Sequence, residues 1–405
     1  AQASFLRFCT FAHCLVPWFR MAPADVAAGP ATVVAATAAA AGVMGASAHP
    51  EGGGLSGGGW ARPAALALAA AAAGSAAWLL WRSQSRSRGP ARVARLFIHP
   101  VKGCKPVEVS EVRLDGLGIV NDRRWAVLDM SKEVGDRVQT ARAQPRLVLV
   151  EPTVAEPGAA VPLALAAPGM PPLRVPMPGS AAQRLEVALW AVPGLALDCG
   201  DEAADWLNKY LGESSLRLAF ISEGPDVQGP VRTRDMCKQE AWNGGNEADS
   251  VYMAGTHVAF ADSVHLTVMS EASLADLNRR LPRGAALTVE RFRMNVLLAG
   301  ARAYEEESWK SFSLGSCAWE VSRLCNRCLV TLVDPETGAR GPQKGQPLEL
   351  LRSFRLPEQL WKVDPRHGTA PILGTKACTA AREGVVRVGD VVSGALLRTE
   401  ADRMY

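Results

Sequence analysis

The segment RVARLFIHPVKGCK (residues 92–105) marks the point where the chain changes texture. Before it the sequence is dominated by Ala and Gly, and after it short runs of Val, Leu and Ile are broken by turn residues. Short apolar runs bounded by turns are typical of strands, so we expect a β-rich α+β fold. The predicted strands are residues 92–98, 124–129, 146–151, 292–298, 329–334 and 385–392.

Helices are expected to be fewer. Residues 201–211 carry Ala and Leu at helical spacing, and Ser270 should cap a second helix whose leucines line one face. Residues 347–354 form a third candidate. A stretch rich in Pro, Ala and Gly at residues 152–178 predicts a long loop, and the polar residues 222–251 predict an insertion.

Composition limits the class of protein. At 405 residues the chain is long enough for two domains and an extension. The 44 basic and 40 acidic residues leave a net charge of +4, which gives no reason to expect a nucleic-acid partner. Nine cysteines, an odd number at irregular spacings, do not resemble a disulfide framework and favour a reducing compartment.

The N-terminal region is expected to be an extension rather than a packed domain. Residues 1–63 form a low-complexity leader, poor in large side chains. Residues 64–81 carry no charge and would reach roughly 27 Å as a helix, enough to cross a membrane. The basic linker 82–91 then places the following domain in the cytosol by the positive-inside rule. A transit peptide, or a buried or cleavable Ala-rich segment, is the alternative.

The most informative local motif is LCNRCLVT (residues 324–331), a Cys-x-x-Cys pair entering an apolar run. Half of a zinc site, a thioredoxin-like dithiol and two ordinary buried cysteines are all compatible with it. The pair lacks a second Cys-x-x-Cys, and a dithiol motif belongs before a helix. Because Arg327 adjoins Cys328 and a guanidinium favours thiolate, Cys328 is a plausible ligand for a transition metal.

Three basic motifs accompany the thiols: residues 100–105, with Lys102 and Gly103, residues 121–125, and residues 292–295. Lysines and backbone N–H groups around a Gly turn can hold a phosphate. Each motif alone could equally be a solvated basic loop or a surface ion pair. Together with a thiol motif, three such loops fit a phosphorylated, metal-bearing ligand.

At this point the sequence resembles the MOSC-domain proteins that carry an N-terminal β-barrel-like subdomain, and within them the mitochondrial amidoxime-reducing components. The similarity covers nearly everything from Val93 to Gly394. The matching segments, in order, are residues 97–102, 122–123, 140–142, 145–147, 198–200, 270–278, 292–293 with Asn295, 325–328, 333–335 and 388–390.

The resemblance implies a MOSC-type β-barrel core at residues 201–396, an N-terminal β-barrel-like subdomain at 92–200, a tail at 397–405 and the membrane anchor ahead of them. It implies that Cys328, and not Cys325, ligates the molybdenum of a molybdenum cofactor. The positions that would hold the pterin and its phosphate are Lys102, Gly103, Arg123, Asp262, Ser263, Val264, Arg293, Asn295, Asn326 and Arg327. Three positions depart from the family pattern: Gly103 and Asn326 replace Ser, and Met294 replaces Pro.

The implied activity is reduction of N-hydroxylated compounds, such as amidoximes and hydroxylamines, to amines or amidines and water. The electrons would come from NADH through cytochrome b5 reductase and cytochrome b5. No Gly-x-Gly-x-x-Gly fingerprint follows a predicted strand, and the chain lacks a haem Cys-x-x-Cys-His, which agrees with electrons arriving from separate proteins. The implied location is the outer mitochondrial membrane, with the catalytic domain facing the cytosol. A carrier that binds the cofactor without turnover is the alternative.

Overall fold

A computed structural model of the protein describes residues 89–156, 158–189, 192–221, 257–283, 285–340, 346–356 and 370–397. The chain divides into two units, residues 1–78 and 79–405, and all described residues belong to the second. The expected leader, the candidate span 64–81, most of the basic linker, and the insertion at 222–251 lie outside the described residues. Among the residues described, no helix is long and apolar enough to cross a membrane.

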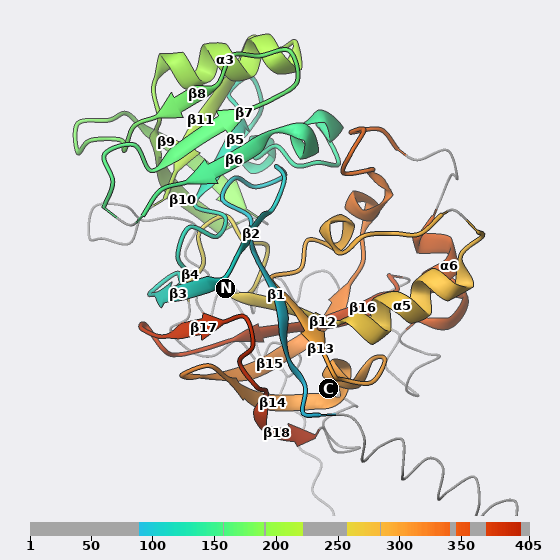
Figure 1. Ribbon diagram of the computed structural model, residues 1–405. Coiled ribbons are helices and arrows are strands. Elements are labelled where there is room, and N and C mark those ends of the chain that lie inside the picture. Colours follow the sequence, from blue (N-terminus) through green and yellow to red (C-terminus); the bar gives the residue numbers. More distant parts are fainter. Residues whose placement is uncertain are drawn as a thin grey trace, which may run out of the picture. The chain divides into compact units, whose positions relative to one another are not determined.

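The larger part of the described chain is built on an eight-stranded sheet (Figure 1). Its strands pair antiparallel except for one parallel pair, β12 with β13. In spatial order they are β18 (Ser393–Leu397), β14 (Trp309–Leu314), β15 (Cys317–Asn326), β16 (Ile372–Cys378), β12 (Leu266–Ser270), β13 (Val296–Ala299), β1 (Arg92–Ile98) and β2 (Val107–Val109).

Alternation along the strands divides this sheet into two apolar faces. On β1, Leu96 and Ile98 pack in one core with residues of β12 to β15, whereas Phe97 packs in another. The second core also takes Leu277 of α5 (Glu271–Arg280) and Leu351 of α6 (Leu348–Phe354). Successive strand residues point to opposite faces, so one short strand contributes to both cores.

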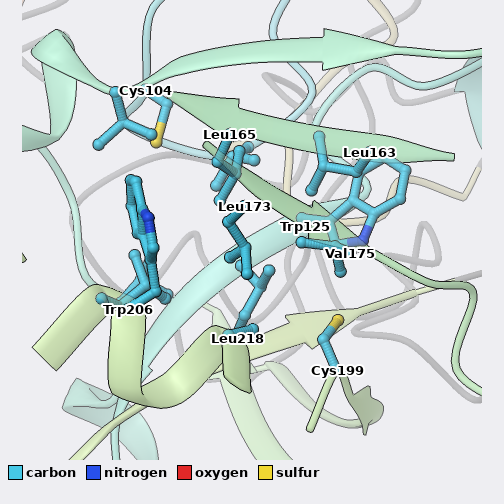
Figure 2. Packing of buried hydrophobic residues seen from close by; sticks show 14 of the residues in the cluster. Cys104, Trp125, Leu163, Leu165, Leu173, Val175, Cys199, Trp206 and Leu218 are labelled. Carbon is cyan, nitrogen blue, oxygen red and sulfur yellow. The ribbon is translucent and has the colours of Figure 1, made fainter. Parts of the chain in front are cut away.

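The first subdomain has its own core (Figure 2). It combines a four-stranded sheet, a three-stranded sheet and one helix, α3 (Asp201–Leu211), whose Trp206 packs against them. The sheet strands are β5 (Trp125–Asp129), β11 (Leu216–Phe220), β10 (Val192–Asp198) and β9 (Arg184–Leu189), then β6 (Glu151–Val154), β7 (Leu163–Ala166) and β8 (Leu173–Val175). A third small sheet joins β17 (Val385–Arg387), β3 (Glu111–Asp115) and β4 (Gly118–Ile119). We expected this subdomain to end at residue 200, but α3 and β11 pack with the elements before it.

The β-rich α+β expectation is confirmed, as are strands β1 and β5 and helices α3 and α5. Ser270 caps α5, since its side chain accepts a hydrogen bond from the N–H of Ser273. The loop expected at 152–178 was wrong, because β6, β7 and β8 form a sheet there. Its few large residues alternate inward: on β7 the residues at the first and third positions are buried.

Four predicted strands were wrong over part or all of their length, and of the strand predicted at 385–392 only Val385–Arg387 is formed. Residues 146–151 are mostly a 3-10 helix (Pro145–Leu149), and the strand starts only at Glu151. The strand predicted at 292–298 starts at Val296. That predicted at 329–334 is a 3-10 turn (Leu329–Leu332), closed by Thr331, whose N–H and hydroxyl donate to the carbonyl of Cys328. The thiol motif therefore begins in the last residues of β15 and leads into a turn.

Candidate functional site

The loop at residues 99–105 lies where the two subdomain cores meet. Ile98, at the end of β1, belongs to the core of the large sheet, whereas Val101 and Cys104 belong to the core of the first subdomain. The N–H of Lys102 donates to the carbonyl of Trp125 over 2.8 Å, which ties the loop to β5. The chain thus places Lys102 and Gly103 at the boundary between the two subdomains.

Lys102 is buried, and its ammonium is held on two sides. Nζ donates to the carbonyl of Phe260 at 2.9 Å and to Oδ1 of Asp262 at 2.6 Å. The charge of Lys102, and next those of Lys376 and Arg123, keep the pKa of Asp262 well below its usual range. The carboxylate therefore stays charged, and its side chain is 60% exposed beside the buried lysine.

Gly103 occupies a backbone conformation that other residues adopt only with strain. Its φ is +89°, and a Cβ there would lie 3.2 Å from Cδ1 of Leu147 and 3.4 Å from the N of Ala141. Glycine is the residue that tolerates this region at no steric cost. Gly103 is buried, and the departure from Ser at this position therefore agrees with the backbone conformation and the tight packing of the turn.

Arg123 is anchored by a buried polar network. Its guanidinium donates to Asp122, to Oδ1 of Asn295 at 3.3 Å and to the carbonyl of Arg293 at 3.2 Å. The amide of Asn295 also donates to the carbonyl of Phe97 at 3.1 Å and to Asp122 at 3.2 Å. Because its side chain is fully engaged inside the protein, Asn295 orients Arg123 and is not open to a ligand.

Arg293 joins this network to the Lys102 loop. It lies in a left-handed conformation (φ 54°) between the 3-10 turn Val289–Phe292 and β13. Nη1 donates to the carbonyl of Cys104 at 2.8 Å, whereas Nη2 is buried without a hydrogen-bond partner in the described part of the chain. Burial, and next the charge of Arg123, lower the pKa of Arg293 to about 10. An unpaired buried donor on a residue that stays cationic at neutral pH is costly unless an anion binds it.

Arg327 has a different position from the one expected. Its guanidinium donates to the carbonyls of Leu373 and Phe292 and to Sδ of Met294, and it is buried under the loop that carries the cysteines. Gly374 leaves space for the side chain of Met294, because a Cβ at position 374 would lie 2.5 Å from Cε of Met294. Since all three nitrogens of its guanidinium are occupied, Arg327 fastens this loop to β16. The expectation that it activates the thiol of Cys328 gains no support from these contacts.

The two cysteines of the motif are unequal in the structure. Cys325 is buried at the end of β15, whereas Cys328 is exposed at the start of the 3-10 turn, and the other described cysteines are buried. Asn326 is also exposed. The interpretation of both thiols as buried core residues is therefore wrong for Cys328. Across the described residues, no group of three or more His, Cys, Asp or Glu side chains could hold a metal ion.

Ser263 and Val264 are both buried, and Ser263 contacts Lys376, a residue that the sequence analysis missed. Nζ of Lys376, on β16, donates to Oγ of Ser263 at 3.3 Å. Burial, and next the charge of Arg323, lower the pKa of Lys376, while Asp262 acts in the opposite direction. Lys376 reaches the site because β16 pairs with β15, where Arg323 lies opposite Lys376. The register of two strands cannot be predicted from one sequence.

His99 was also missed as a site residue. It is fully buried, Nε2 lies 3.2 Å from the carbonyl of Met294, and Nδ1 has no hydrogen-bond partner in the described residues. Burial, and next the charges of Arg123 and Arg293, keep its pKa well below the ordinary value, so the ring is neutral. The ring therefore packs against the arginines without adding to their charge.

The site can bind an anion and offers one accessible thiol. Arg123 and Arg293 share one hydrogen-bond network, and Arg293 also contacts the loop that carries Lys102. Nη2 of Arg293 is unpaired among the described residues, and the thiol of Cys328 is exposed. Anionic phosphate groups and soft metals are the ligands that such donors favour.

Fold and site together are those of a MOSC-domain protein. Two family models match the chain. The model described as MOSC N-terminal beta barrel domain matches residues 90–214, and the model described as MOSC domain matches residues 255–393. The chain belongs to the family of the mitochondrial amidoxime-reducing components, a family of molybdenum-cofactor-dependent reductases.

Three relatives of similar sequence support this family membership. Mitochondrial amidoxime-reducing component 1 of Mus musculus is 34% identical over 347 residues, 82% of this chain and 91% of the relative. Component 2 of Rattus norvegicus is 33% identical over 82% of this chain and 92% of the relative. Component 1 of Homo sapiens is 31% identical over 82% and 93%.

Proposed function

We propose that this protein is a molybdenum-cofactor-dependent reductase that converts N-hydroxylated compounds to amines or amidines and water. The observation that supports this most is the combination of an exposed Cys328 with an unpaired, buried donor on Arg293. Membership of the amidoxime-reducing family supplies the reaction class.

The residues present fit the cofactor at both ends. The phosphate of the cofactor would be held by the side chains of Lys102, Arg123 and Arg293, together with the backbone of the turn at Gly103. The thiolate of Cys328 would ligate the molybdenum, because soft thiolates select transition metals. When bound, the cofactor supplies the two-electron chemistry that removes the hydroxyl oxygen.

The chain's own contribution is positioning and charge. Asn295 keeps Arg123 in one orientation, Arg327 fastens the cysteine loop, and Asp262 offsets part of the charge of Lys102. Leu329, half-exposed next to Cys328, offers an apolar side chain suited to the organic part of a substrate.

We further propose that NADH supplies the electrons through cytochrome b5 reductase and cytochrome b5. The family membership and the lack of a dinucleotide fingerprint after any predicted strand support an external donor. Residues 64–81 would anchor the chain in the outer mitochondrial membrane, with the domain in the cytosol, and the word mitochondrial in the names of the relatives supports this organelle.

Reconstitution tests the proposal. The cofactor-loaded chain, mixed with cytochrome b5, its reductase, NADH and benzamidoxime, should form benzamidine, and omission of cytochrome b5 should stop the reaction. The Cys328→Ala variant should lose turnover and Cys325→Ala should keep it. A chain that binds the cofactor and shows no turnover with any N-hydroxylated compound would be a carrier instead.

A further inference from the structure

The first residues of strand β16 lie beyond the end of its neighbour β12. The two strands pair only at residues 375–377 of β16, and β12 then ends at Ser270, where α5 begins. β16 itself starts at Ile372, and residues 371–375 are all buried. We call residues 371–374 the β16 start. Buried backbone N–H and C=O groups need partners, so the β16 start requires something in place of β12.

Two consecutive glutamates take the place of the missing strand. They lie in the 3-10 turn Glu305–Ser308, and both are buried. Oε1 of Glu306 accepts a hydrogen bond from the N–H of Ser270, at the end of β12, over 3.1 Å. Oε1 of Glu307 accepts from the N–H of Gly374, in the β16 start, over 2.8 Å. The first carboxyl therefore closes β12, and the second continues the hydrogen bonding of β16.

Arg355 completes the replacement. Its guanidinium forms an ion pair with Oε2 of Glu307, and both side chains are buried. Nε of Arg355 donates to the carbonyl of Ile372 over 3.2 Å, and the N–H of Ile372 donates to the backbone carbonyl of Arg355 over 2.9 Å. Arg355 thus exchanges two hydrogen bonds with Ile372, as the opposite residue of an antiparallel strand would. The buried ion pair is therefore built into the backbone bonding of β16.

The β16 start also fastens the loop that carries the exposed thiol. The N–H of Arg327 donates to the carbonyl of Pro371 over 2.8 Å, and Nε donates to the carbonyl of Leu373 over 2.8 Å. Arg327 directly precedes Cys328. The four residues of the β16 start therefore alternate, because two accept from Arg327 and the other two bond to the ion pair. Close packing transmits a shift on one side of such a segment to the other.

We propose that Glu307 and Arg355 are positioning residues that hold the thiol of Cys328 in the direction needed for metal ligation. They act through the β16 start and Arg327, because both side chains are buried whereas the thiol is exposed. Hydrogen bonds that orient a metal ligand from behind preorganise the site. The inference rests on the proposed function, since it takes Cys328 as the ligand of molybdenum.

Hydrogen exchange of the full, cofactor-free chain, measured by mass spectrometry, tests the coupling. Glu307→Gln keeps an oxygen for the N–H of Gly374 but removes the charge that holds Arg355. Glu306→Gln is the matched control, the same substitution one residue earlier, on a carboxyl that bonds to the start of α5 rather than to β16. The measurement is made at pH 8, above the pKa of Glu307, which is about 7.

The amides of residues 326–333 should exchange roughly tenfold faster or more in Glu307→Gln, because removal of a buried partner lowers the free energy of local opening. In Glu306→Gln these amides should exchange as in wild type. Arg355→Lys is a milder change that keeps a cation beside Glu307, and it should give a smaller increase. A rise at residues 326–333 no larger than the rise in β9 and β10 would overturn the proposal, since the pair would then stabilise the fold alone.

Molybdenum content is the second readout. It should fall in Glu307→Gln and not in Glu306→Gln, because loss of a residue that orients a ligand typically lowers metal affinity by ~10–100-fold. Wild-type molybdenum content in Glu307→Gln would overturn the proposal. A wild-type chain without molybdenum would overturn the proposed function and with it the role in ligation, and the exchange rates would show separately whether the ion pair holds the loop.

Discussion

Arg293 donates from Nη1 to the backbone carbonyl of Cys104 over 2.8 Å, while its Nη2 is buried and has no partner among the described residues. One guanidinium therefore connects the two subdomains and keeps one donor for a ligand. Its neighbour Arg123 repels it, and burial lowers its pKa to about 10. A site with an excess of positive charge, in which Asp122 and Asp262 offset only part, is expected where an anion completes the structure.

Replacing Arg293 separates binding from folding. In Arg293→Met the hydrogen bond to Cys104 is lost, but the repulsion with Arg123 and the unpaired donor also disappear, so the opposing changes should leave the stability of the cofactor-free chain within about 1 kcal/mol of wild type. Cofactor retention should fall about tenfold or more, because a charge-assisted hydrogen bond is worth roughly 1.5–3 kcal/mol. Thermal unfolding and fluorescence of the oxidised pterin measure the two effects.

A control is available in the first subdomain. Arg217, on β11, pairs with Asp198 and with Asp201, so Arg217→Met should lower stability and leave cofactor retention unchanged. Equal loss of cofactor in both variants would contradict a specific role for Arg293.

Gly103 should resist the family's serine. Because its φ is +89° and a Cβ would lie 3.2 Å from Leu147, Gly103→Ser should cost about 1–2 kcal/mol of unfolding free energy. Gly135→Ser is the matched control, since a Cβ there meets nothing within 4 Å. Urea unfolding at one pH compares them. A serine at position 103 that leaves stability unchanged would show that the turn relaxes without strain.

The adjacent buried pair Glu306 and Glu307 gives a pH-dependent prediction. Burial raises the pKa of both carboxyls, that of Glu307 to about 7 although the charge of Arg355 opposes the shift. A carboxyl with a raised folded pKa contributes stability that is fully present below its unfolded value, about 4.5, and is lost as pH rises toward 7. Oε1 of Glu306 accepts hydrogen bonds from Ser270 and Ser273, and Oε2 is unpartnered in the described residues.

As pH rises from 5 to 8, the free energy of unfolding of Glu306→Gln should therefore fall less than that of wild type. The lowered pKa values of His99 and His265 act in the opposite direction, so the difference between wild type and variant in urea titrations is the measurement. Parallel curves would show that Glu306 does not hold a proton in this range.

Glu307→Gln should behave differently from its neighbour. It removes the ion pair with Arg355, both members of which are buried, and leaves an uncompensated guanidinium. A loss of roughly 3–5 kcal/mol is expected above pH 7, where Glu307 is ionised and pairs with Arg355, and a smaller loss at lower pH, where wild-type Glu307 is protonated; urea unfolding at pH 5 and pH 8 measures both. A loss no larger than that of Glu306→Gln would contradict the ion pair.

The sequence predicted well where one element dictates its own pattern. Strand β1 and helices α3 and α5 follow from periodicity and a cap, because these signals are local. The turn after Cys328 was missed because an apolar, β-branched run is typical of a strand, and its hydrogen bonds to Cys328 are not visible in composition. Strands β7 and β8 were missed because their few inward-pointing leucines stand in a stretch rich in Ala and Pro, which are not typical of strands.

The candidate site was predictable as a set of residues but not as a set of roles. Family resemblance selected Lys102, Arg293 and Cys328, yet it could not tell that Arg327 donates inward to β16. Lys376 reaches the site only through the pairing of β15 with β16, a long-range contact that no local motif carries.

The molybdenum content of purified protein tests the central claim most directly. The account predicts about one molybdenum per chain in wild type and in Cys325→Ala, because the buried thiol is not a ligand, and almost none in Cys328→Ala. Folded Cys328→Ala protein that retained the wild-type amount of molybdenum would contradict the assignment of the exposed thiol as the metal ligand.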